Sequence, residues 1–145
     1  MQARVLIAGE ARAEALASDA PLSFWGGYDH ATGEIIDRRH PLSGQIAAHR
    51  VLILPYTIGS STTTAVLLEA IRAGNAPAAI ITRGPDKYLC LASIVAQEMY
   101  QRPVPVLSLE DAEFARIRTG QVITIHADGI VEVDSQEKTA CPDGS

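Results

Sequence analysis

The chain has 145 residues, 47% of them hydrophobic and 20% charged, and its net charge is −5. These values are typical of a globular domain with an ordinary core and exclude an intrinsically disordered chain. Basic residues are scattered, apart from Arg38 and Arg39, which excludes an electrostatic footprint for nucleic acid. No apolar run is long enough to span a membrane, and residues 1–17 lack the pattern of a secretory signal. We therefore expect a cytoplasmic domain without nucleic-acid or membrane partners.

The two cysteines and four histidines show no pattern typical of a metal site. Cys90 falls in an apolar stretch and Cys141 in a polar one, whereas an iron-sulfur cluster needs about four ligands at defined spacing. The histidines are also spaced too irregularly for a ligand set: His30, His40, His49 and His126. We expect this chain to bind no metal, so that any cluster comes from another chain.

The first fifty residues are predicted to be rich in β-structure. Residues 5–9 predict a short strand, and residues 10–20 predict an extended segment at the edge of a sheet. Residues 34–37 predict a further strand between two turns. The only tryptophan is followed by two glycines at residues 25–27, for which two interpretations remain open: a turn that seals the core, and a loop that faces a ligand.

From residue 51 onward, predicted strands alternate with predicted helices. The strands are continuous apolar runs, as expected where both faces of a sheet are covered. The second helix places Leu91, Val95 and Met99 along one stripe, which is typical of a face turned toward the core. The alternation predicts right-handed crossovers and a mostly parallel central sheet. The predicted strands are residues 51–55, 78–82 and 104–107, and the predicted helices are residues 63–74 and 88–100.

A hairpin is predicted near the C-terminus. Two apolar segments, residues 122–125 and 130–133, flank the Asp-Gly pair at residues 128–129, in which glycine supplies the positive φ of a tight turn. Residues 135–145 are polar and contain proline and glycine. We expect them to be a disordered tail beyond a domain of residues 1–134.

The most distinctive segment links the strand at residues 51–55 to the helix that follows. Its loop carries Gly59, and residues 60–64 are five consecutive hydroxyl residues. The start of a helix presents unpaired N–H groups and the positive end of its dipole, and ligands of open α/β sheets bind beyond the carboxyl ends of the strands. A serine here also serves as an ordinary cap, although five hydroxyl residues exceed what a cap needs. Both a cap and an anion-binding site remain open.

Sharper motif interpretations of this loop fail. It lacks the lysine and glycine spacing of a P-loop, and Gly59-Ser60-Ser61 is not the elbow of a serine hydrolase. Elsewhere, His40 follows two arginines and precedes a proline. It is a candidate for holding a carboxylate, with a solvated turn as the alternative.

Several segments together resemble the small subunit, or swivel domain, of aconitase X proteins. The resemblance runs from about residue 9 to residue 107 and implies an α/β fold: a swivelling domain of three layers, β/β/α, with a mostly parallel central sheet and a C-terminal hairpin. It rests on Pro21-Leu22-Ser23-Phe24-Trp25-Gly26-Gly27-Tyr28-Asp29, Thr32-Gly33, Asp37, His40-Pro41-Leu42-Ser43-Gly44, Gly59-Ser60-Ser61-Thr62 and Leu67-Leu68-Glu69.

The resemblance also implies an activity. Members of this family pair with a larger subunit that carries an iron or iron-sulfur centre, and they include cis-3-hydroxy-L-proline dehydratase and phosphomevalonate dehydratase. The family's proton acceptor, the serine directly after the loop glycine, corresponds to Ser60, with Ser61 as the fallback. Iron in the partner would take the departing hydroxyl. The related aconitase loop has arginine where this chain has Thr62, so the substrate carboxylate must be held elsewhere.

A small hydroxy acid is the expected substrate. The absence of a basic residue at residues 56–58 favours hydroxyproline over a phosphorylated substrate. Asp29 would meet the ring ammonium of a hydroxyproline, or else it is a turn residue that binds its own backbone. The expected substrate-binding residues are Gly59, Ser61, Thr62, Trp25, Gly26, Gly27, Asp29 and His40.

Two functions of other classes remain open. The C-terminal hairpin also resembles that of phosphotransfer swivelling domains, but these require a phosphorylatable histidine at the site, and none lies within residues 51–72. The other alternative is a non-catalytic regulatory subunit, in which the Gly59 loop only shapes an interface.

Overall fold

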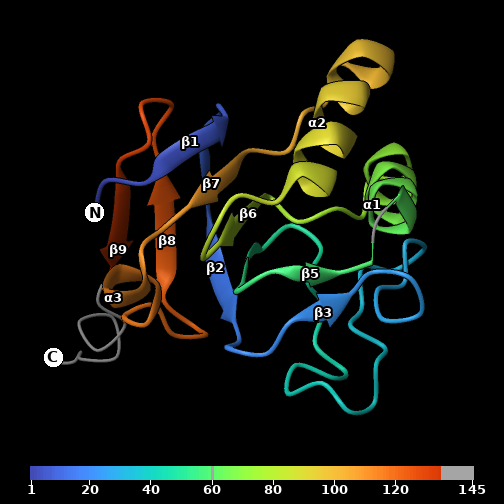
Figure 1. Cartoon of the computed structure of the whole chain (residues 1–145), viewed down its shortest axis with the longest axis horizontal. Helices are drawn as coiled ribbons and strands as arrows, with labels where there is room; N and C mark the ends of the chain where they lie inside the picture. The colour runs from blue at the N-terminus through green and yellow to red at the C-terminus, as the bar shows by residue number, and fades with distance from the viewer. Residues whose placement is uncertain (60, 135–145) are drawn as a thin grey trace, which may run out of the picture.

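The computed structural model describes residues 1–59 and 61–134, which form a seven-stranded sheet, a two-stranded sheet and three helices (Figure 1). The larger sheet has the strand order β1-β7-β6-β4-β2-β8-β9, and β3 pairs with β5. The strands are β1 (Arg4–Ile7), β2 (Ala11–Ala17), β3 (Leu22–Ser23), β4 (Val51–Leu54), β5 (Thr57–Ile58), β6 (Ala79–Thr82), β7 (Val106–Ser108), β8 (Val122–Ile125) and β9 (Val131–Asp134). The helices are α1 (Ser61–Ala73), α2 (Lys87–Tyr100) and α3 (Asp111–Phe114). The predicted tail at residues 135–145 lies outside the described residues.

The middle of the sheet is parallel, as the alternation of strands and helices predicts. β7, β6, β4 and β2 pair in this order, each parallel to its neighbour. Antiparallel strands flank them, with β1 on one side and β8 and β9 on the other. The predicted hairpin is confirmed, because β8 and β9 pair directly and Gly129 has a φ of 93° in the turn.

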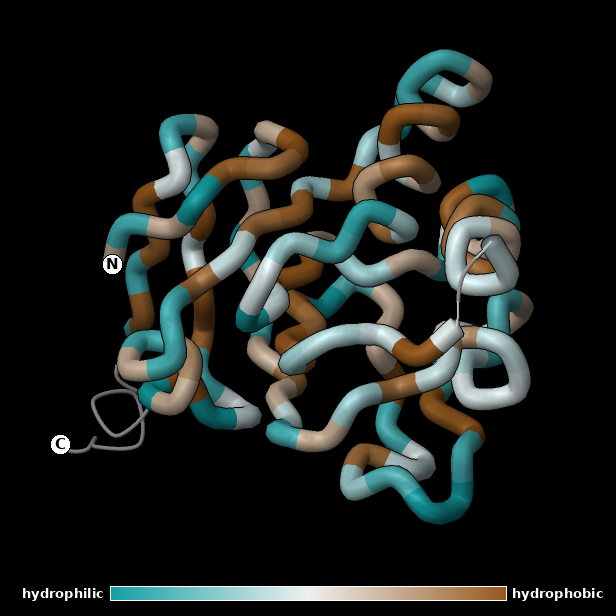
Figure 2. Tube along the Cα trace, viewed as in Figure 1, coloured by the Kyte–Doolittle hydropathy of each residue, from teal (hydrophilic) through white to brown (hydrophobic). Residues whose placement is uncertain are grey.

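Two hydrophobic cores, one on each face of the central strands, make the fold a three-layer structure. Successive residues of a strand point to opposite faces, so Leu52 and Leu54 of β4 pack toward α1 and α2, whereas Val51 and Ile53 pack toward β8, β9 and α3. Figure 1 shows the two long helices on one side of these strands and the hairpin with α3 on the other. Figure 2 shows hydrophobic residues along the central strands and hydrophilic stretches in the outer turns. The predicted β/β/α layering is therefore confirmed.

The segment at residues 10–20 is extended, as predicted, but its predicted place at an edge is wrong. Within it, β2 lies between two strands: its first part pairs with β8, and Ala15 to Ala17 pair with β4. Ala15 and Leu16 are fully buried. The segment looks like an edge in the sequence because β2 is built mainly from alanine, whose small side chain gives a weak hydrophobic signal.

The strand predicted at residues 34–37 is absent from the described structure, which shows only isolated bridges there, between Tyr28 and Ile35 and between Glu34 and Ile46. The backbone of this segment bonds to two different turns rather than to one neighbouring strand. The Ile35 N–H donates to the Gln45 carbonyl, and the next N–H donates to the Gly27 carbonyl. Because no single partner strand runs alongside, a regular ladder does not form.

The prediction of which face of α2 is buried is wrong. Leu91 and Met99 are exposed, and the helix packs inward through Leu89, Ala92, Ser93 and Ala96 instead. Small residues allow a helix to lie close to its neighbours, and the Ser93 hydroxyl is satisfied by the backbone of Val104, with O···O and O···N distances of 2.7 and 2.8 Å. Even with apolar side chains on its outer face, α2 does not span a membrane: no helix within residues 1–59 and 61–134 has the required length and apolar character.

Candidate functional site

The Gly59 loop lies where two parallel strands end and two helices begin. β4 leads through β5 into α1, and the neighbouring β6 leads into α2 (Figure 1). Both helices therefore present their N-terminal ends beyond the carboxyl edge of the sheet, which is the usual place for a ligand in an open α/β sheet. The first turn of α1 has no acidic residue to offset the positive end of its dipole, whereas α2 is capped by the carboxylate of Asp86.

Gly59 has a conformation that other residues adopt only with strain. Its φ is 114°, and a Cβ atom there would lie 3.2 Å from the Thr62 hydroxyl and 3.4 Å from the Thr63 hydroxyl. The glycine thus lets the chain turn tightly into α1. Ser60, the predicted proton acceptor, lies outside the described residues, but both of its chain neighbours are placed at this turn.

The run of hydroxyl residues divides into two roles. The Thr63 hydroxyl is buried and donates to the Ile58 carbonyl, and the Thr64 hydroxyl donates to the Tyr88 carbonyl at 2.9 Å. These two threonines therefore fix the loop and tie α1 to α2. Ser61 and Thr62 are exposed at the start of α1 and remain available to a ligand.

The tryptophan segment is brought to the same place by pairing between β3 and β5. Leu22 pairs with Thr57 and Ser23 with Ile58, so the residues that follow each strand, among them Trp25 and Gly59, lie at the same end of this small sheet. Trp25 is 70% exposed. The structure therefore brings two of the predicted segments together, although they are more than 30 positions apart in the sequence.

The structure divides this segment between the core and the surface, as each of the two open interpretations requires for some of its residues. Phe24 and Tyr28 seal the core, with both rings buried and stacked at a centroid distance of 5.0 Å. Trp25 faces solvent between them in the sequence. Gly26 has a φ of 81°, and a Cβ atom on Gly27 would lie 2.2 Å from the Ser23 carbonyl oxygen, so the turn requires both glycines.

The structure does not bring Asp29 to the loop. Its carboxylate accepts from the Ala31 N–H at 2.9 Å, which is the turn role left open from the sequence. The next residues are held by Asn75, whose side chain donates to the carbonyls of His30 and Ala31. Asn75 follows the C-terminal end of α1, a helix of 13 residues. Such a helix is about 20 Å long, so this turn lies at the end of α1 away from Gly59.

His40 is likewise part of the scaffold. It is buried, its Nε2 atom lies 3.1 Å from the Ala20 carbonyl oxygen, and its Nδ1 atom accepts from the Leu42 N–H at 3.1 Å. With both ring nitrogens engaged, the side chain fixes the loop before β4 against the end of β2. No nitrogen is left to bind a carboxylate in this arrangement.

A groove of about 570 Å³ opens beside the Gly59 loop, and it contains residues that the motifs did not single out. We call it the loop groove. None of the four histidines lines it. Its lining residues are Tyr56, Thr57, Gly59, Pro85, Asp86, Lys87, Tyr88 and Cys90.

Asp86 is the central scaffold residue of the loop groove. It is buried, and one carboxylate oxygen caps α2 by accepting from the N–H groups of Tyr88 and Leu89 at 3.1 and 3.2 Å. The other oxygen accepts from the Thr57 hydroxyl at 2.5 Å and the Thr57 N–H at 3.2 Å. An aspartate before an apolar helix is a cap signal in the sequence, but nothing in the sequence indicates its bond to β5.

Lys87 places a cation in the loop groove, with its Nζ atom 5.3 Å from the centre of the Tyr88 ring. The argument that the loop has no basic residue beside it is therefore wrong. It considered only neighbours in the sequence, whereas the fold brings the start of α2 to the loop. Ordinary exposed lysines carry no sequence signal that could have identified this one.

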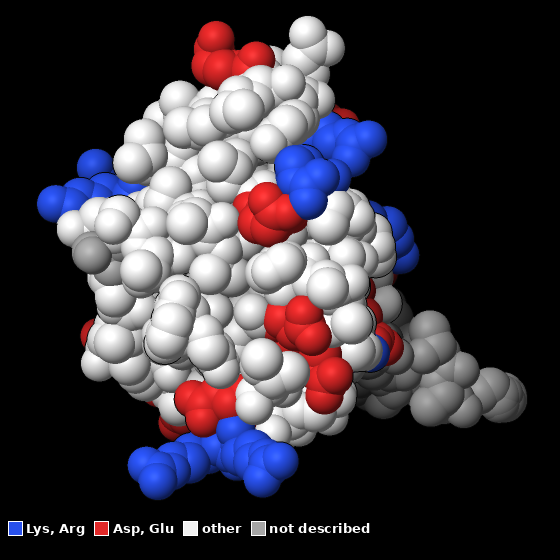
Figure 3. Space-filling model, turned by 90° about the vertical axis from the view of Figure 1, so that its right-hand side faces the viewer, with Lys and Arg blue, Asp and Glu red and all other residues white. Residues whose placement is uncertain are grey.

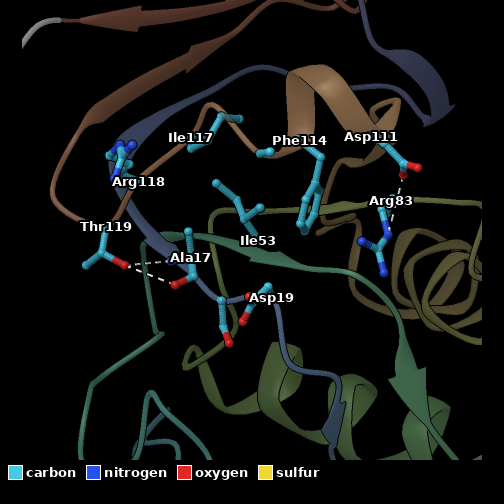
Figure 4. Close-up of a pocket in the computed structure, with 11 residues that line it drawn as sticks. Ala17, Asp19, Ile53, Arg83, Asp111, Phe114, Ile117, Arg118 and Thr119 are labelled. Carbon is cyan, nitrogen blue, oxygen red and sulfur yellow. Dashed lines mark hydrogen bonds and ion pairs between the residues drawn. The ribbon is translucent and has the colours of Figure 1, made fainter.

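A second cavity, of about 510 Å³, lies on the other side of the β6–α2 connection, between the central strands and α3 (Figure 4). Arg83 and Asp111 point toward each other there, with 3.6 Å between the nearest nitrogen and oxygen atoms. Arg118 extends from the opposite wall, and Ile53 and Phe114 line the space between. None of the predicted site residues lines this cavity.

The described residues do not fit a metal centre. Among residues 1–59 and 61–134, no three residues of the types His, Cys, Asp and Glu are grouped so that they could hold a metal ion. Burial, and secondarily the charge of Asp86, raises the pKa of the Cys90 thiol, which disfavours the thiolate that a metal would need. The chemistry of this side of the site is that of hydroxyl groups, backbone N–H groups and one lysine.

Comparisons with known proteins agree on one family. The model of the aconitase X swivel domain matches residues 1–133. A cis-3-hydroxy-L-proline dehydratase from Pseudomonas aeruginosa is 49% identical over 106 residues, which are 73% of this chain but only 18% of that protein. A phosphomevalonate dehydratase small subunit from Methanopyrus kandleri is 37% identical over 122 residues, 83% of this chain and 86% of the subunit.

The fold of the chain is also similar to that of an aconitase X protein. The crystal structure of Thermococcus kodakaraensis aconitase X in its holo-form superimposes with a TM-score of 0.81 at 28% identity, covering 92% of this chain and 97% of that one. The chain thus matches one small subunit over nearly its whole length and about a fifth of a longer dehydratase.

Proposed function

The chain belongs to the aconitase X swivel-domain family, and on this basis we propose that it is the small subunit of a dehydratase that removes water from a small hydroxy acid. The observation that carries the proposal is the Gly59 turn. It begins α1 beyond the carboxyl edge of the sheet, next to the start of α2, and opens into the loop groove. The two similar proteins named above, both dehydratases, support the class of reaction.

We propose cis-3-hydroxy-L-proline as the substrate. The support is the higher identity to the Pseudomonas dehydratase, 49% against 37% for the phosphomevalonate dehydratase subunit. Phosphomevalonate is the second candidate, and Lys87 in the loop groove is the observation that favours it, because an ammonium group binds phosphate well. The assay below compares the two directly.

We propose Ser60 as the residue that accepts the carbon-bound proton. A serine hydroxyl is a poor base until it is deprotonated, and its alkoxide needs nearby positive potential. The start of α1 supplies backbone N–H groups and the positive end of a dipole, and Lys87 supplies a cation across the loop groove. Ser61, exposed in the first turn of α1, is the fallback.

We assign the departure of the hydroxyl group to a large subunit. Elimination of water needs a Lewis acid for the leaving hydroxyl, and the described residues of this chain do not fit a metal centre. In this proposal the large subunit carries an iron centre. The present chain binds, orients and deprotonates the substrate, and the cleft between the subunits excludes water.

The test is a dehydration assay of the chain with its large subunit, on cis-3-hydroxy-L-proline and on phosphomevalonate. We expect neither part to turn over substrate alone, and we expect activity on the hydroxyproline when both are present. Activity on phosphomevalonate alone would transfer the substrate assignment to the second candidate. A reconstituted, metal-loaded pair that dehydrates neither acid would contradict the proposed function and support a regulatory role.

The proton acceptor is tested in the same pair. Ser60→Ala should lower kcat by a factor of about 10² to 10⁴, the usual contribution of a positioned base, with little change in substrate binding. Ser61→Ala is the matched comparison and should lower kcat much less than Ser60→Ala does. If Ser60→Ala turned over at the wild-type rate while Ser61→Ala was inactive, the role would pass to Ser61.

A further inference from the structure

Five of the exposed large hydrophobic residues form one surface around the mouth of the loop groove. Each exposes between 49% and 70% of its area. Two come from the loop before α1, one from the segment after β3, and two from the outer face of α2. We call the set the docking surface: Trp25, Tyr56, Ile58, Leu91 and Ile94.

Three members of this surface line two adjoining grooves. Tyr56 lines the loop groove, and Leu91 and Ile94 line a second groove of about 490 Å³ on α2. The two grooves share Lys87, Tyr88 and Cys90 as lining residues, so one runs into the other. Trp25 joins on the far side of the loop, because β3 and β5 pair through Ser23 and Ile58.

The docking surface is more apolar than is usual for a surface exposed to solvent. Leu91 and Ile94 lie three positions apart and share one face of α2, on which a solvent-exposed helix carries charged and polar residues. Figure 3 looks onto the side formed by α1 and α2 and shows an area without charged side chains over part of this face, beside scattered groups of Lys, Arg, Asp and Glu. Contiguous exposed apolar surface of this kind marks a site of association.

We propose that the docking surface binds the large subunit of the same enzyme. This inference rests on the proposed function and extends it by naming the residues of the interface. Two observations select this occupant. The surface surrounds the only part of the described chain to which we assign chemistry, and that chemistry needs a metal-bearing partner at the same groove. In addition, the matched region is only 18% of the Pseudomonas relative, so in that protein a module of this kind belongs to a much longer chain that can supply a partner surface.

A second copy of this chain fits the surface less well. Two copies meeting here would place their Gly59 loops face to face, and neither would bring the described residues of a metal site. A large subunit, by contrast, would close the loop groove over the substrate while burying the hydrophobic side chains at its rim. Burial of such a rim excludes water from the enclosed contacts.

The first test measures binding between the chain and its large subunit by titration calorimetry. The double variant Leu91→Asp, Ile94→Asp places two carboxylates in the apolar contact and should weaken binding by about 100-fold or more. Ile130→Asp is the matched control: it changes an exposed isoleucine, 39% accessible, in the β8–β9 turn away from this surface, and should bind within about twofold of wild type. Circular dichroism of each free variant checks that it folds.

The second test needs no change to the docking surface. Cys90 lines both grooves, so in a Cys141→Ser background it is the single thiol of the chain. We expect the large subunit to slow its alkylation at least about tenfold. Unchanged alkylation within the formed complex, or wild-type binding by the double variant, would overturn the docking surface while leaving the dehydratase function standing.

Two further outcomes are informative. Sedimentation that shows a dimer of the free chain, broken by the double variant, would assign the surface to a second copy and refute the proposal. A wild-type chain that neither binds the large subunit nor yields dehydratase activity would refute the proposed function together with this inference.

Discussion

Replacing Asp86 by asparagine should destabilise the chain, because an amide has fewer oxygen atoms that can accept hydrogen bonds than a carboxylate has. The carboxylate uses one oxygen for two N–H groups of α2 and the other for the hydroxyl and N–H of Thr57. An amide has a single acceptor oxygen. Whichever way Asp86→Asn is rotated, its NH2 group faces donors on one side, so either the helix cap or the bond to β5 is lost.

The magnitude follows from the bonds that are lost. Hydrogen bonds to a charged group contribute about 1.5–3 kcal/mol each, and a buried donor left without a partner costs a similar amount. With two such bonds lost and partial relaxation of an exposed loop, we expect Asp86→Asn to lower the free energy of unfolding by about 2–4 kcal/mol. In a domain of this size that corresponds to a decrease in Tm of roughly 5–12 °C.

Urea unfolding of the isolated chain, followed by circular dichroism, measures this effect. Thr57→Val removes only the hydroxyl bond and should cost about 1–2 kcal/mol, and the two changes together should cost clearly less than their sum, because they share an interaction. Glu110→Gln is the matched control, since Glu110 stands at the N-cap of α3 without a side-chain cap bond. An Asp86→Asn chain within about 0.5 kcal/mol of wild type, or additive effects of the pair, would refute the reasoning.

Two other predictions concern the segment after β3. Burial raises the pKa of Tyr28 above its usual 10.0, so at alkaline pH the folded chain retains a proton that the unfolded chain loses, and stability falls as pH rises above about 10. Tyr28→Phe also removes the 2.6 Å hydrogen bond to the Asn75 carbonyl, so it should lower the free energy of unfolding by about 1 kcal/mol at neutral pH. It should also reduce the loss of stability at alkaline pH. Unfolding curves of the wild type and the variant that shift equally between pH 8 and pH 10.5 would contradict this prediction. Gly27→Ala should lower the free energy of unfolding by about 2–3 kcal/mol, because its Cβ would lie 2.2 Å from the Ser23 carbonyl oxygen. Gly26→Ala should lower it by about 1–2 kcal/mol, because its Cβ would have space but its φ of 81° is unfavourable for alanine. The opposite order in thermal unfolding would show that the turn yields more easily than its geometry implies.

The sequence predicts the parts of the fold that are defined by large side chains and by glycine. Continuous apolar runs identify β4 and β6, Gly74 with its φ of 81° ends α1, and Gly129 places the hairpin turn. These signals are local, because each depends on the conformation or burial of a few neighbouring residues. The parallel middle of the sheet follows from them by the handedness of crossovers.

Small residues account for the two main errors in the predicted fold, the position of β2 and the buried face of α2. β2 is interior although it is rich in alanine, and α2 packs through Ala92, Ser93 and Ala96 rather than through its larger Leu91 and Met99. Hydrophobic periodicity gives most weight to large side chains. Close approach of two layers needs small ones, so the periodicity selected the wrong face.

Only part of the site could be predicted for a similar reason. Gly59 and the start of α1 follow from local sequence, but contacts between distant segments do not. A two-residue pairing joins β3 to β5, and one carboxylate joins Asp86 to Thr57. Neither leaves a periodic signal, and Lys87 enters the loop groove only as a result of them. Asp29 and His40 were selected by motif and are held in turns instead.

The outward-facing hydrophobic side chains of α2 have a consequence for how such an enzyme is produced. If the chain is the proposed subunit, its free form exposes Leu91, Ile94 and Trp25 and is prone to self-association whenever it is made in excess of the proposed partner. Cells that produce the two parts from separate genes must therefore match their amounts. Where the same module forms about a fifth of one longer polypeptide, as in the Pseudomonas relative, a one-to-one ratio is set by translation itself.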